Sequence, residues 1–192
     1  MNWFHPPGPV ADGLKIGLLG GSFNPAHAGH LYVAETALKR LGLDYVWFLV
    51  APQNPLKPSR GMLPFEKRLA SARALAGRHP RLKVTDLEQK IGSRYTIDTI
   101  RALNARFPRV AFVWLMGSDN LTQFHRWRHW EEIVERLPVA VVLRPGSTLA
   151  PLRAKAMQRC KGRIIVLDGR RNETSATAIR AGIGAGAGSV LE

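Results

Sequence analysis

The sequence predicts an α/β fold in which a doubly wound, mostly parallel sheet is covered by helices. Three observations lead to this prediction. Apolar stretches of strand length alternate with stretches that carry apolar residues at helical spacing along most of the chain. The strand-like stretches are continuously apolar, which is typical of strands covered on both faces of a parallel sheet. Turns and polar residues follow several of them, where the ligand-binding loops of such a sheet are expected.

The first half of the chain predicts three strands and two helices. Residues 15–19 are an apolar run that ends in a glycine pair, which indicates a short buried strand. Residues 28–41 place apolar side chains at helical spacing, and Gly42 is a typical stop signal. The other expected elements are a strand at 45–51, a long loop at 52–63, a helix at 64–76 that begins with Pro64, and a short strand at 82–85.

The second half continues the alternation. Residues 96–106 predict a helix, because Ile97, Ile100 and Leu103 are spaced to face a core. The other expected elements are a strand at 110–116, a helix at 130–136 that ends before Pro138, strands at 139–143 and 164–167, and a helix at 176–181.

The length and composition favour a single domain. The 192 residues are enough for one well-buried core, which we expect at 15–183. Residues 1–14 are expected to form a flexible N-terminal extension, and the glycine-rich residues 184–192 a flexible tail. No apolar run reaches membrane-spanning length, and the N-terminus does not resemble a secretory signal. The single cysteine, Cys160, favours the reducing cytoplasm.

The net charge is unusual for a chain of this kind. The sequence has 28 Lys and Arg against 14 Asp and Glu, a formal net charge of +14. A polyanionic partner is therefore plausible, and both nucleotide phosphates and nucleic acid are candidates. The basic residues are dispersed rather than gathered into one tail, so a solvated basic surface also explains them.

The first of three polar clusters, GGSFNPAHAGH at 20–30, follows the first expected strand. Gly20 and Gly21 let the backbone approach a ligand closely, and the following helix N-terminus is suited to an anion. His27 and His30 are three residues apart, so they project from about one face of that helix. They could donate hydrogen bonds to phosphate oxygens during phosphoryl or nucleotidyl transfer. The alternative is one capping histidine and one packed histidine.

The second and third clusters follow later strands. In GSDNLTQFHRW at 117–127, Asp119 could cap a helix or accept hydrogen bonds from ribose, and Trp127 could stack on a base or pack in the core. In ETSATAIR at 173–180, Ser175 and Thr177 could present hydroxyls and amides to phosphate beside Arg180, or simply cap a helix. The carboxyl ends of parallel strands share one edge, so we expect the three clusters to meet.

Several other kinds of site are disfavoured. The chain has no G-x-x-x-x-G-K-[ST] phosphate loop, and its glycines do not form G-x-G-x-x-G. His125 and His129 are four apart, but HRWRH lacks the glutamate of H-E-x-x-H, so we interpret them as residues on a helix surface.

Four motifs resemble those of nucleotidyltransferases with an H-x-G-H signature and, more narrowly, of bacterial nicotinate-mononucleotide adenylyltransferases. The first motif, at 20–30, contains HAGH at 27–30. The others are YTIDT at 95–99, a G-x-D at 117–119 with Trp127 downstream, and SATAIR at 175–180. Together they span about residues 15 to 181 in the order found in the family.

The resemblance implies a Rossmann-like fold of the nucleotidyltransferase type and a specific reaction. The adenylyl group of ATP would pass to nicotinate mononucleotide, giving nicotinate adenine dinucleotide (deamido-NAD) and pyrophosphate in NAD biosynthesis. Such in-line transfer needs positioning and charge neutralisation rather than a protein nucleophile. Mg²⁺ would be bound through the substrate phosphates. The expected partners are ATP and nicotinate mononucleotide, and neither nucleic acid nor a membrane is expected, while a homo-oligomer is left open.

The resemblance also implies which residues form the site. The expected ATP-binding residues are Gly20, Gly21, Ser22, Phe23, His27, His30, Ser175, Thr177 and Arg180, of which His27, His30 and Arg180 would be catalytic. The expected mononucleotide-binding residues are Lys57, Thr96, Asp119 and Trp127. Trp127 would stack on the pyridine ring, and Thr96 with neighbouring amides would lie near the carboxylate. Because such a site rejects the amide analogue, nicotinate should be preferred over nicotinamide mononucleotide. No protein ligand for a metal is expected.

Two other functions remain as alternatives. Pantetheine-phosphate adenylyltransferase shares H-x-G-H and the same kind of transfer, although YTIDT and SATAIR favour the nicotinate enzyme. A basic nucleic-acid-binding module on a Rossmann-like sheet would explain the net charge, and it would bind nucleic acid in a salt-sensitive way without ATP turnover.

Overall fold

A computed structural model describes residues 5–52, 61–143, 153–160 and 162–168. The expected helix at 176–181 and the tail at 184–192 lie outside these ranges, as do four expected site residues: Lys57, Ser175, Thr177 and Arg180.

The fold is built on a six-stranded sheet with the order β3-β2-β1-β4-β5-β6. All five strand pairs are parallel, which confirms the predicted fold class. The strands are β1 (Lys15–Gly21), β2 (Tyr45–Val50), β3 (Leu82–Thr85), β4 (Ala111–Gly117), β5 (Val139–Leu143) and β6 (Ile164–Asp168).

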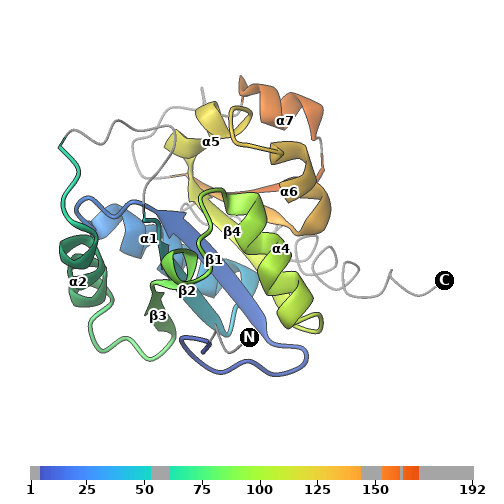
Figure 1. The fold of residues 1–192 in the computed structure, drawn as a ribbon. Coiled ribbons are helices and arrows are strands. Elements are labelled where there is room, and N and C mark those ends of the chain that lie inside the picture. The colour runs from blue at the N-terminus through green and yellow to red at the C-terminus, as the bar shows by residue number, and fades with distance from the viewer. Residues whose placement is uncertain (1–4, 53–60, 144–152, 161, 169–192) are drawn as a thin grey trace.

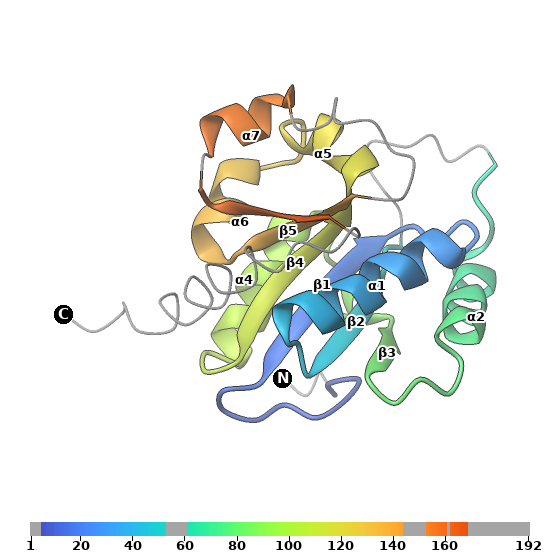
Figure 2. The same cartoon turned by 180° about the vertical axis from the view of Figure 1, so that it is seen from behind.

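Helices cover both faces of the sheet (Figures 1 and 2). On one face lie α1 (Ala28–Leu41) and α2 (Phe65–Ala76), whose buried side chains belong to one apolar cluster. The other face carries a second cluster, with side chains from α3 (Leu87–Lys90), α4 (Thr96–Arg106), α5 (Ser118–Phe124), α6 (Trp130–Arg136) and α7 (Lys155–Arg159).

The strands are continuously apolar because successive residues enter different clusters. In β2, Trp47 and Leu49 pack on the α4 face, whereas Val46, Phe48 and Val50 pack on the α1 face. All five side chains are fully buried. A strand buried on both sides has no position for a polar side chain, which is the reason that the pattern predicts a parallel sheet.

The structure differs from the prediction mainly in short elements. The four-residue helix α3 and the five-residue helix α7 were not predicted, because they are too short to show a helical period. The seven-residue helix α5 was expected only as a helix that Asp119 could cap, without bounds. Gly20 and Gly21 belong to β1, so this strand continues through the glycine pair that was expected to end it.

The central strands create the opening for a site. After β1 the chain enters α1 on one face of the sheet, and after β4 it enters α5 on the other face. Since β1 and β4 are neighbours, their loops diverge and leave a crevice at their carboxyl ends, as expected at a topological switch point.

The segment before β1 is attached to the domain. The Gly13 amide donates to the Arg109 carbonyl at 2.9 Å, and the Arg109 guanidinium pairs with the Asp12 carboxylate at 2.6 Å. Val10 and Leu14 also pack against the core. The assignment of 1–14 as a flexible extension stays a prediction.

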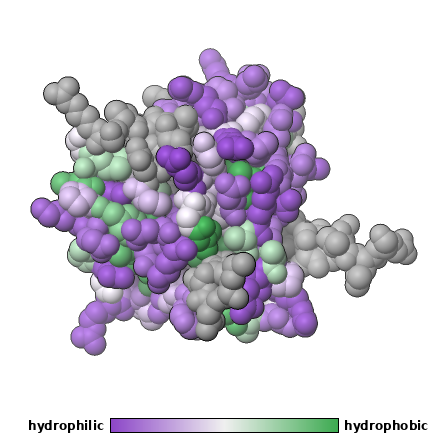
Figure 3. All heavy atoms as spheres, viewed as in Figure 1, coloured by the Kyte–Doolittle hydropathy of each residue, from purple (hydrophilic) through white to green (hydrophobic). Residues whose placement is uncertain are grey.

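The surface is mainly polar. Figure 3 shows hydrophilic residues over most of the face that carries α4, which fits the net charge of +14. In the described part of the chain, no helix has both the length and the apolar character needed to cross a membrane.

Candidate active site

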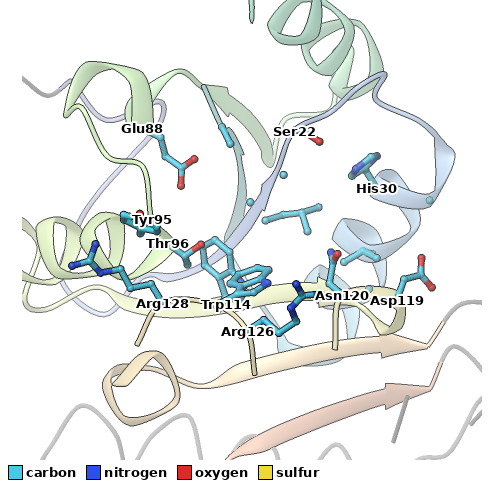
Figure 4. A pocket seen from close by; sticks show the side chains of 18 of the residues that line it. Ser22, His30, Glu88, Tyr95, Thr96, Trp114, Asp119, Asn120, Arg126 and Arg128 are labelled. Carbon is cyan, nitrogen blue, oxygen red and sulfur yellow. The ribbon is translucent and has the colours of Figure 1, made fainter. Parts of the chain in front are cut away.

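A cavity of about 470 Å³ opens at the carboxyl ends of β1 and β4. Its volume is typical of small-molecule sites. Residues of the first two polar clusters line it together with residues 94–96 (Figure 4). We call residues 20–30 the histidine wall, and residues 94–96 with 117–128 the aromatic wall. Trp114 lies between the two walls, while Ser22 and His30 are opposite Tyr95 and Thr96.

The two histidines cap α1 and also line the cavity. His27 is the N-cap residue, and its Nδ1 accepts a hydrogen bond from the Gly29 amide at 3.1 Å. Nδ1 of His30 accepts from the His27 amide at 3.2 Å, completing a capping box. The two interpretations of this pair, as caps and as phosphate-binding groups, are therefore compatible.

The capping bonds assign the tautomer of each ring. A neutral imidazole has one N–H donor and one acceptor, and both Nδ1 atoms act as acceptors here. The proton of each neutral ring is therefore on Nε2. The two rings lie side by side with centroids 4.0 Å apart. This pair offers N–H donors near the positive N-terminal end of a helix, which suits a phosphate.

The Phe23 ring packs against the ring of His30. Its side chain is 1% exposed and does not line the cavity. Its ring lies 4.6 Å from the His30 ring and stacks on Phe48 at 5.4 Å between centroids. The Phe23 side chain therefore contacts His30 rather than the cavity, and a part for Phe23 in ATP binding stays a prediction.

Gly20 is required where the two walls meet. A Cβ atom at this position would lie only 2.4 Å from Cη2 of Trp114, so a side chain would displace the indole. A Cβ atom at Gly21 would have its nearest neighbour, in the Phe23 ring, at 3.5 Å, which is an ordinary contact. Of the two glycines, only Gly20 must lack a side chain because of the residues packed around it.

Arg68 anchors the end of the histidine wall, which the sequence did not indicate. This α2 side chain is 1% exposed. Its guanidinium donates to the carbonyls of Ser22 at 2.7 Å, Ala51 at 2.7 Å, Pro52 at 2.6 Å and Leu63 at 3.0 Å. Burial lowers the pKa of the Arg68 guanidinium from its ordinary value. These carbonyls compensate the buried charge of the guanidinium. Arg68 therefore links the segment after β1 to the segment after β2.

Asp119 and Trp127 both line the cavity, as predicted from the second cluster. Gly117, and not Asp119, is the N-cap residue of α5, so the capping interpretation of Asp119 is wrong. The Trp127 ring meets Trp114 edge-on at 6.0 Å and Phe124 edge-on at 5.3 Å between centroids. Trp127 thus combines core packing with exposure to the cavity.

Three arginines also line the cavity and were missed from the sequence: Arg94, Arg126 and Arg128. The Arg128 guanidinium lies over the Tyr95 ring, 4.7 Å from its centroid. The pattern HRWRH could have indicated two of these arginines, because it places Arg126 and Arg128 on either side of Trp127. These guanidiniums favour a ligand that carries several negative charges.

The first turn of α4 faces the cavity at the aromatic wall. Thr96 is its first residue and Tyr95 its N-cap residue, and the Tyr95 side chain makes no capping bond. The helix has 11 residues, so its N-terminal amides carry the partial positive charge expected of a regular helix. Thr96 therefore lines the cavity at a helix N-terminus, and its role in binding a carboxylate stays a prediction.

Glu88 is a buried carboxyl group in the cavity, and it was also missed. It is 7% exposed and lines the cavity from α3. The Thr99 hydroxyl lies 3.2 Å from its Oε1. Burial raises the pKa of Glu88 to about 7, and the hydrogen bond with Thr99 only partly opposes this effect.

The other two histidines of the motif region do not lie on a helix surface as predicted. His125 is the C-cap residue of α5, and His129 is the N-cap residue of α6 with a φ of 49°. They occupy the ends of the turn that joins these helices. Among the described residues, no group of three or more His, Cys, Asp or Glu side chains could hold a metal ion.

Comparison with known proteins identifies the class. The model of the Cytidylyltransferase-like family matches residues 18–182, which contain strands β2 to β6, the second half of β1 and both walls of the cavity. The solved structure of Plasmodium falciparum nicotinic acid mononucleotide adenylyltransferase complexed with NaAD has a similar fold, with a TM-score of 0.68. It is 15% identical, and the match covers 85% of this chain and 79% of that one. Fold and cavity therefore define a Rossmann-like nucleotidyltransferase.

Closer relatives identify the family within that class. A Parvibaculum lavamentivorans protein named "Probable nicotinate-nucleotide adenylyltransferase" is 58% identical over 140 residues, which are 73% of this chain and 69% of the relative. A Ruegeria pomeroyi protein of the same name is 52% identical over 163 residues, which are 82% of this chain and 76% of the relative. The chain belongs to the nicotinate-nucleotide adenylyltransferase family, which confirms the resemblance.

Proposed function

We propose that this cavity transfers the adenylyl group of ATP to nicotinate mononucleotide, forming deamido-NAD and releasing pyrophosphate. The observation that carries the proposal is the pairing of two walls in one cavity. The histidine wall offers N–H donors at the start of α1, and the aromatic wall offers indole and guanidinium groups opposite them. Family membership gives the proposal its substrates.

The histidine wall would act on the phosphates of ATP. An oxygen of the mononucleotide phosphate attacks the α-phosphorus, and the bond from the α-phosphorus to the leaving pyrophosphate breaks. Charge accumulates on the phosphate oxygens during this step. Nε2–H groups of His27 and His30, aided by the N-terminus of α1, can donate hydrogen bonds to those oxygens. Gly20, Gly21 and Ser22 would bring the backbone of the wall close to the nucleotide.

The aromatic wall would bind the mononucleotide. We assign Trp127 to stacking against the pyridine ring, and Thr96 with the first amides of α4 to the nicotinate carboxylate. Asp119 would lie near the sugars. The three arginines on this wall supply positive charge for a substrate that carries both a carboxylate and a phosphate.

Four residues outside the described ranges complete the proposal on the strength of their motifs. Ser175, Thr177 and Arg180 would hold the triphosphate, with Arg180 stabilising charge in the transition state, and Lys57 would assist in binding the mononucleotide. We also propose that the reaction takes place in the cytoplasm, which fits a chain with one cysteine.

We propose Mg²⁺ as the metal ion of the reaction. When bound to ATP, Mg²⁺ neutralises charge on the triphosphate and the leaving pyrophosphate. Magnesium is usually held by substrate phosphates with one or two carboxylates. The cavity has room for nucleotide phosphates beside the N–H donors of the histidine wall, so the residues present fit an ion that is carried by the substrate phosphates.

Pyrophosphate release tests the proposal. Purified protein is incubated with ATP, Mg²⁺ and one acceptor at a time: nicotinate mononucleotide, nicotinamide mononucleotide or phosphopantetheine. We expect release with nicotinate mononucleotide and a lower kcat/KM with the amide, because the carboxylate site would leave polar groups unpaired. Release with phosphopantetheine alone would assign the alternative enzyme. No release with any acceptor, combined with salt-sensitive binding of unrelated DNA or RNA, would favour a nucleic-acid-binding module.

A further inference from the structure

A chain of hydrogen bonds links Glu88 to the backbone of the aromatic wall. Oε1 of Glu88 lies 3.2 Å from Oγ1 of Thr99, which lies 2.9 Å from Oγ of Ser93. Oγ of Ser93 donates to the Tyr95 carbonyl at 2.9 Å. The Ser93 amide also donates to the Glu88 carbonyl at 2.9 Å. The chain thus joins α3, the turn after it and the first turn of α4.

Counting hydrogens assigns the protonation state of Glu88. The Tyr95 carbonyl can only accept, so the Ser93 hydroxyl hydrogen is used there. The contact between Ser93 and Thr99 must then use the Thr99 hydrogen. The third contact, between Thr99 and Glu88, has no hydrogen left unless the carboxyl itself supplies one. All three contacts are hydrogen bonds only when Glu88 is a neutral acid.

Ionised Glu88 would disrupt the chain. A carboxylate would take the Thr99 hydrogen, because hydrogen bonds to charged acceptors are the stronger ones. Thr99 could then be bonded by Ser93 only if Ser93 released the Tyr95 carbonyl. If Ser93 kept that bond, two lone pairs would face each other across 2.9 Å. Either outcome loosens the turn that presents Tyr95 and Thr96 to the cavity.

We propose that Glu88 is a positioning residue that shapes the mononucleotide side of the cavity only as a neutral acid, so that its ionisation weakens mononucleotide binding. This inference rests on the proposed function. Figure 4 shows the Glu88 carboxyl in the cavity on the same side as Tyr95 and Thr96. A carboxylate there would also repel the carboxylate of nicotinate, which adds to the loss of the hydrogen-bond chain.

The surroundings of Glu88 favour its neutral form. The side chain is 7% exposed and, among the residues that the structure describes, forms no ion pair. Burial raises the pKa of Glu88 to about 7, so both forms are populated near neutral pH. The titratable side chains on the neighbouring elements and across the cavity are His27, His30, Tyr45, Lys83, Asp86, Lys90, Arg94, Tyr95, Asp98, Arg101, Arg106, Asp119, Arg126 and Arg128.

The pH dependence of KM for nicotinate mononucleotide tests the proposal. We expect this KM in the wild-type protein to rise roughly twentyfold between pH 6.5 and 8.5, as the competent neutral fraction falls. In Glu88→Gln the amide still donates to Thr99 but cannot ionise, so KM should vary much less with pH. The matched control is Glu132→Gln, a partly exposed carboxyl on α6 that lies outside the cavity and bonds Arg101 of α4 at 2.6 Å. It should keep the wild-type profile.

Comparing the KM profile of the wild type with that of Glu88→Gln separates the effect of Glu88 from other effects of pH. The phosphate of the substrate is the same in assays of the wild type and of Glu88→Gln, so the difference between the two KM profiles reports Glu88. An equal rise of KM in both proteins would overturn the proposal. Should Glu88→Gln fail to fold, Thr99→Val breaks the same chain while leaving the carboxyl in place. It should raise KM already at pH 6.5, and an unchanged KM there would equally overturn the proposal.

A measurement without turnover separates this inference from the proposed function. Infrared difference spectra of the wild type minus Glu88→Gln, taken at pH 6 without substrate, should contain the absorption of a protonated carboxyl. Its presence in a protein that releases no pyrophosphate would leave the hydrogen-bond assignment standing and refute the function. Its absence in an active protein would refute the assignment alone.

Discussion

The histidine wall and the aromatic wall are held in place by different kinds of contact. In the histidine wall, backbone amides within three residues bind both imidazoles through Nδ1, so these bonds to the two rings are local, whereas Arg68 anchors the end of the wall from α2. In the aromatic wall, rings and guanidiniums contact one another across long stretches of chain, as Arg128 does with Tyr95. The fixed donors of the histidine wall are suited to aligning the phosphates of ATP. The large side chains of the aromatic wall are suited to recognising the pyridine ring of the mononucleotide. We therefore expect changes in the first wall to affect kcat and changes in the second to affect KM.

His30→Ala is expected to have the largest effect. Loss of a donor that stabilises transition-state charge typically lowers kcat by roughly 10²–10³-fold. Steady-state kinetics would measure this, while circular dichroism checks the fold. The matched control is His79→Ala, since His79 also accepts a backbone amide through Nδ1, from Arg81 at 3.3 Å, but does not line the cavity. Unchanged turnover in His30→Ala would contradict the assignment of the histidine wall to kcat.

Trp127→Ala should act mainly on the other substrate. Stacking on an aromatic side chain contributes about 1–3 kcal/mol per base, so KM for the mononucleotide should rise at least roughly fivefold. The loss of kcat should be much smaller than in His30→Ala. Trp127→Phe keeps an aromatic face and should recover part of the affinity. If KM for ATP rose instead, the tryptophan would have been assigned to the wrong nucleotide.

Gly20→Ala tests the contact where the walls meet. Its Cβ atom would approach Trp114 to 2.4 Å, so the indole or the strand must shift. Overpacking of this kind costs about 1–3 kcal/mol in free energy of unfolding. Denaturant unfolding would measure the loss, with Gly21→Ala as the matched control because its Cβ has ordinary contacts. Equal stability of the two variants would show that Trp114 moves aside easily.

Arg128→Met should have the smallest effect of the four. It removes the guanidinium from the Tyr95 ring but keeps a long apolar side chain. A cation–π contact at an exposed site contributes about 0.5–1 kcal/mol, so KM for the mononucleotide should rise by roughly two- to fivefold. The rise should shrink as salt is added, because screening weakens a long-range charge effect. A rise that did not depend on salt would indicate lost packing rather than lost charge.

Much of the fold could be predicted because the strands and long helices carry strong periodic signals. The boundaries expected for α1 and α4 agree with the structure residue for residue. Helices α3 and α7 were missed because a helix of one turn has no period to detect. The same limit explains why Glu88 was missed, since it is carried by α3.

Candidate site residues were predictable where a motif carried them. His27, His30, Thr96, Asp119 and Trp127 were selected from motifs, and the structure brings them to one cavity. Their roles in binding and catalysis stay predictions. Phe23 was selected in the same way, yet its side chain is buried, because a motif records which residues occur together and not which way each one points.

The sequence by itself determined the class of fold, the family and the cluster at 20–30, because these depend on local order: apolar runs, glycines and the spacing of two histidines. Only the tertiary structure decided which polar groups lose contact with water. Arg68 and Glu88 appear in the sequence as ordinary charged residues, yet both are buried in the structure. Arg68 finds four carbonyl acceptors there, while Glu88 has hydroxyl neighbours that are satisfied by a neutral acid. Desolvation depends on segments distant in the chain, so the state of a buried charge follows from the fold.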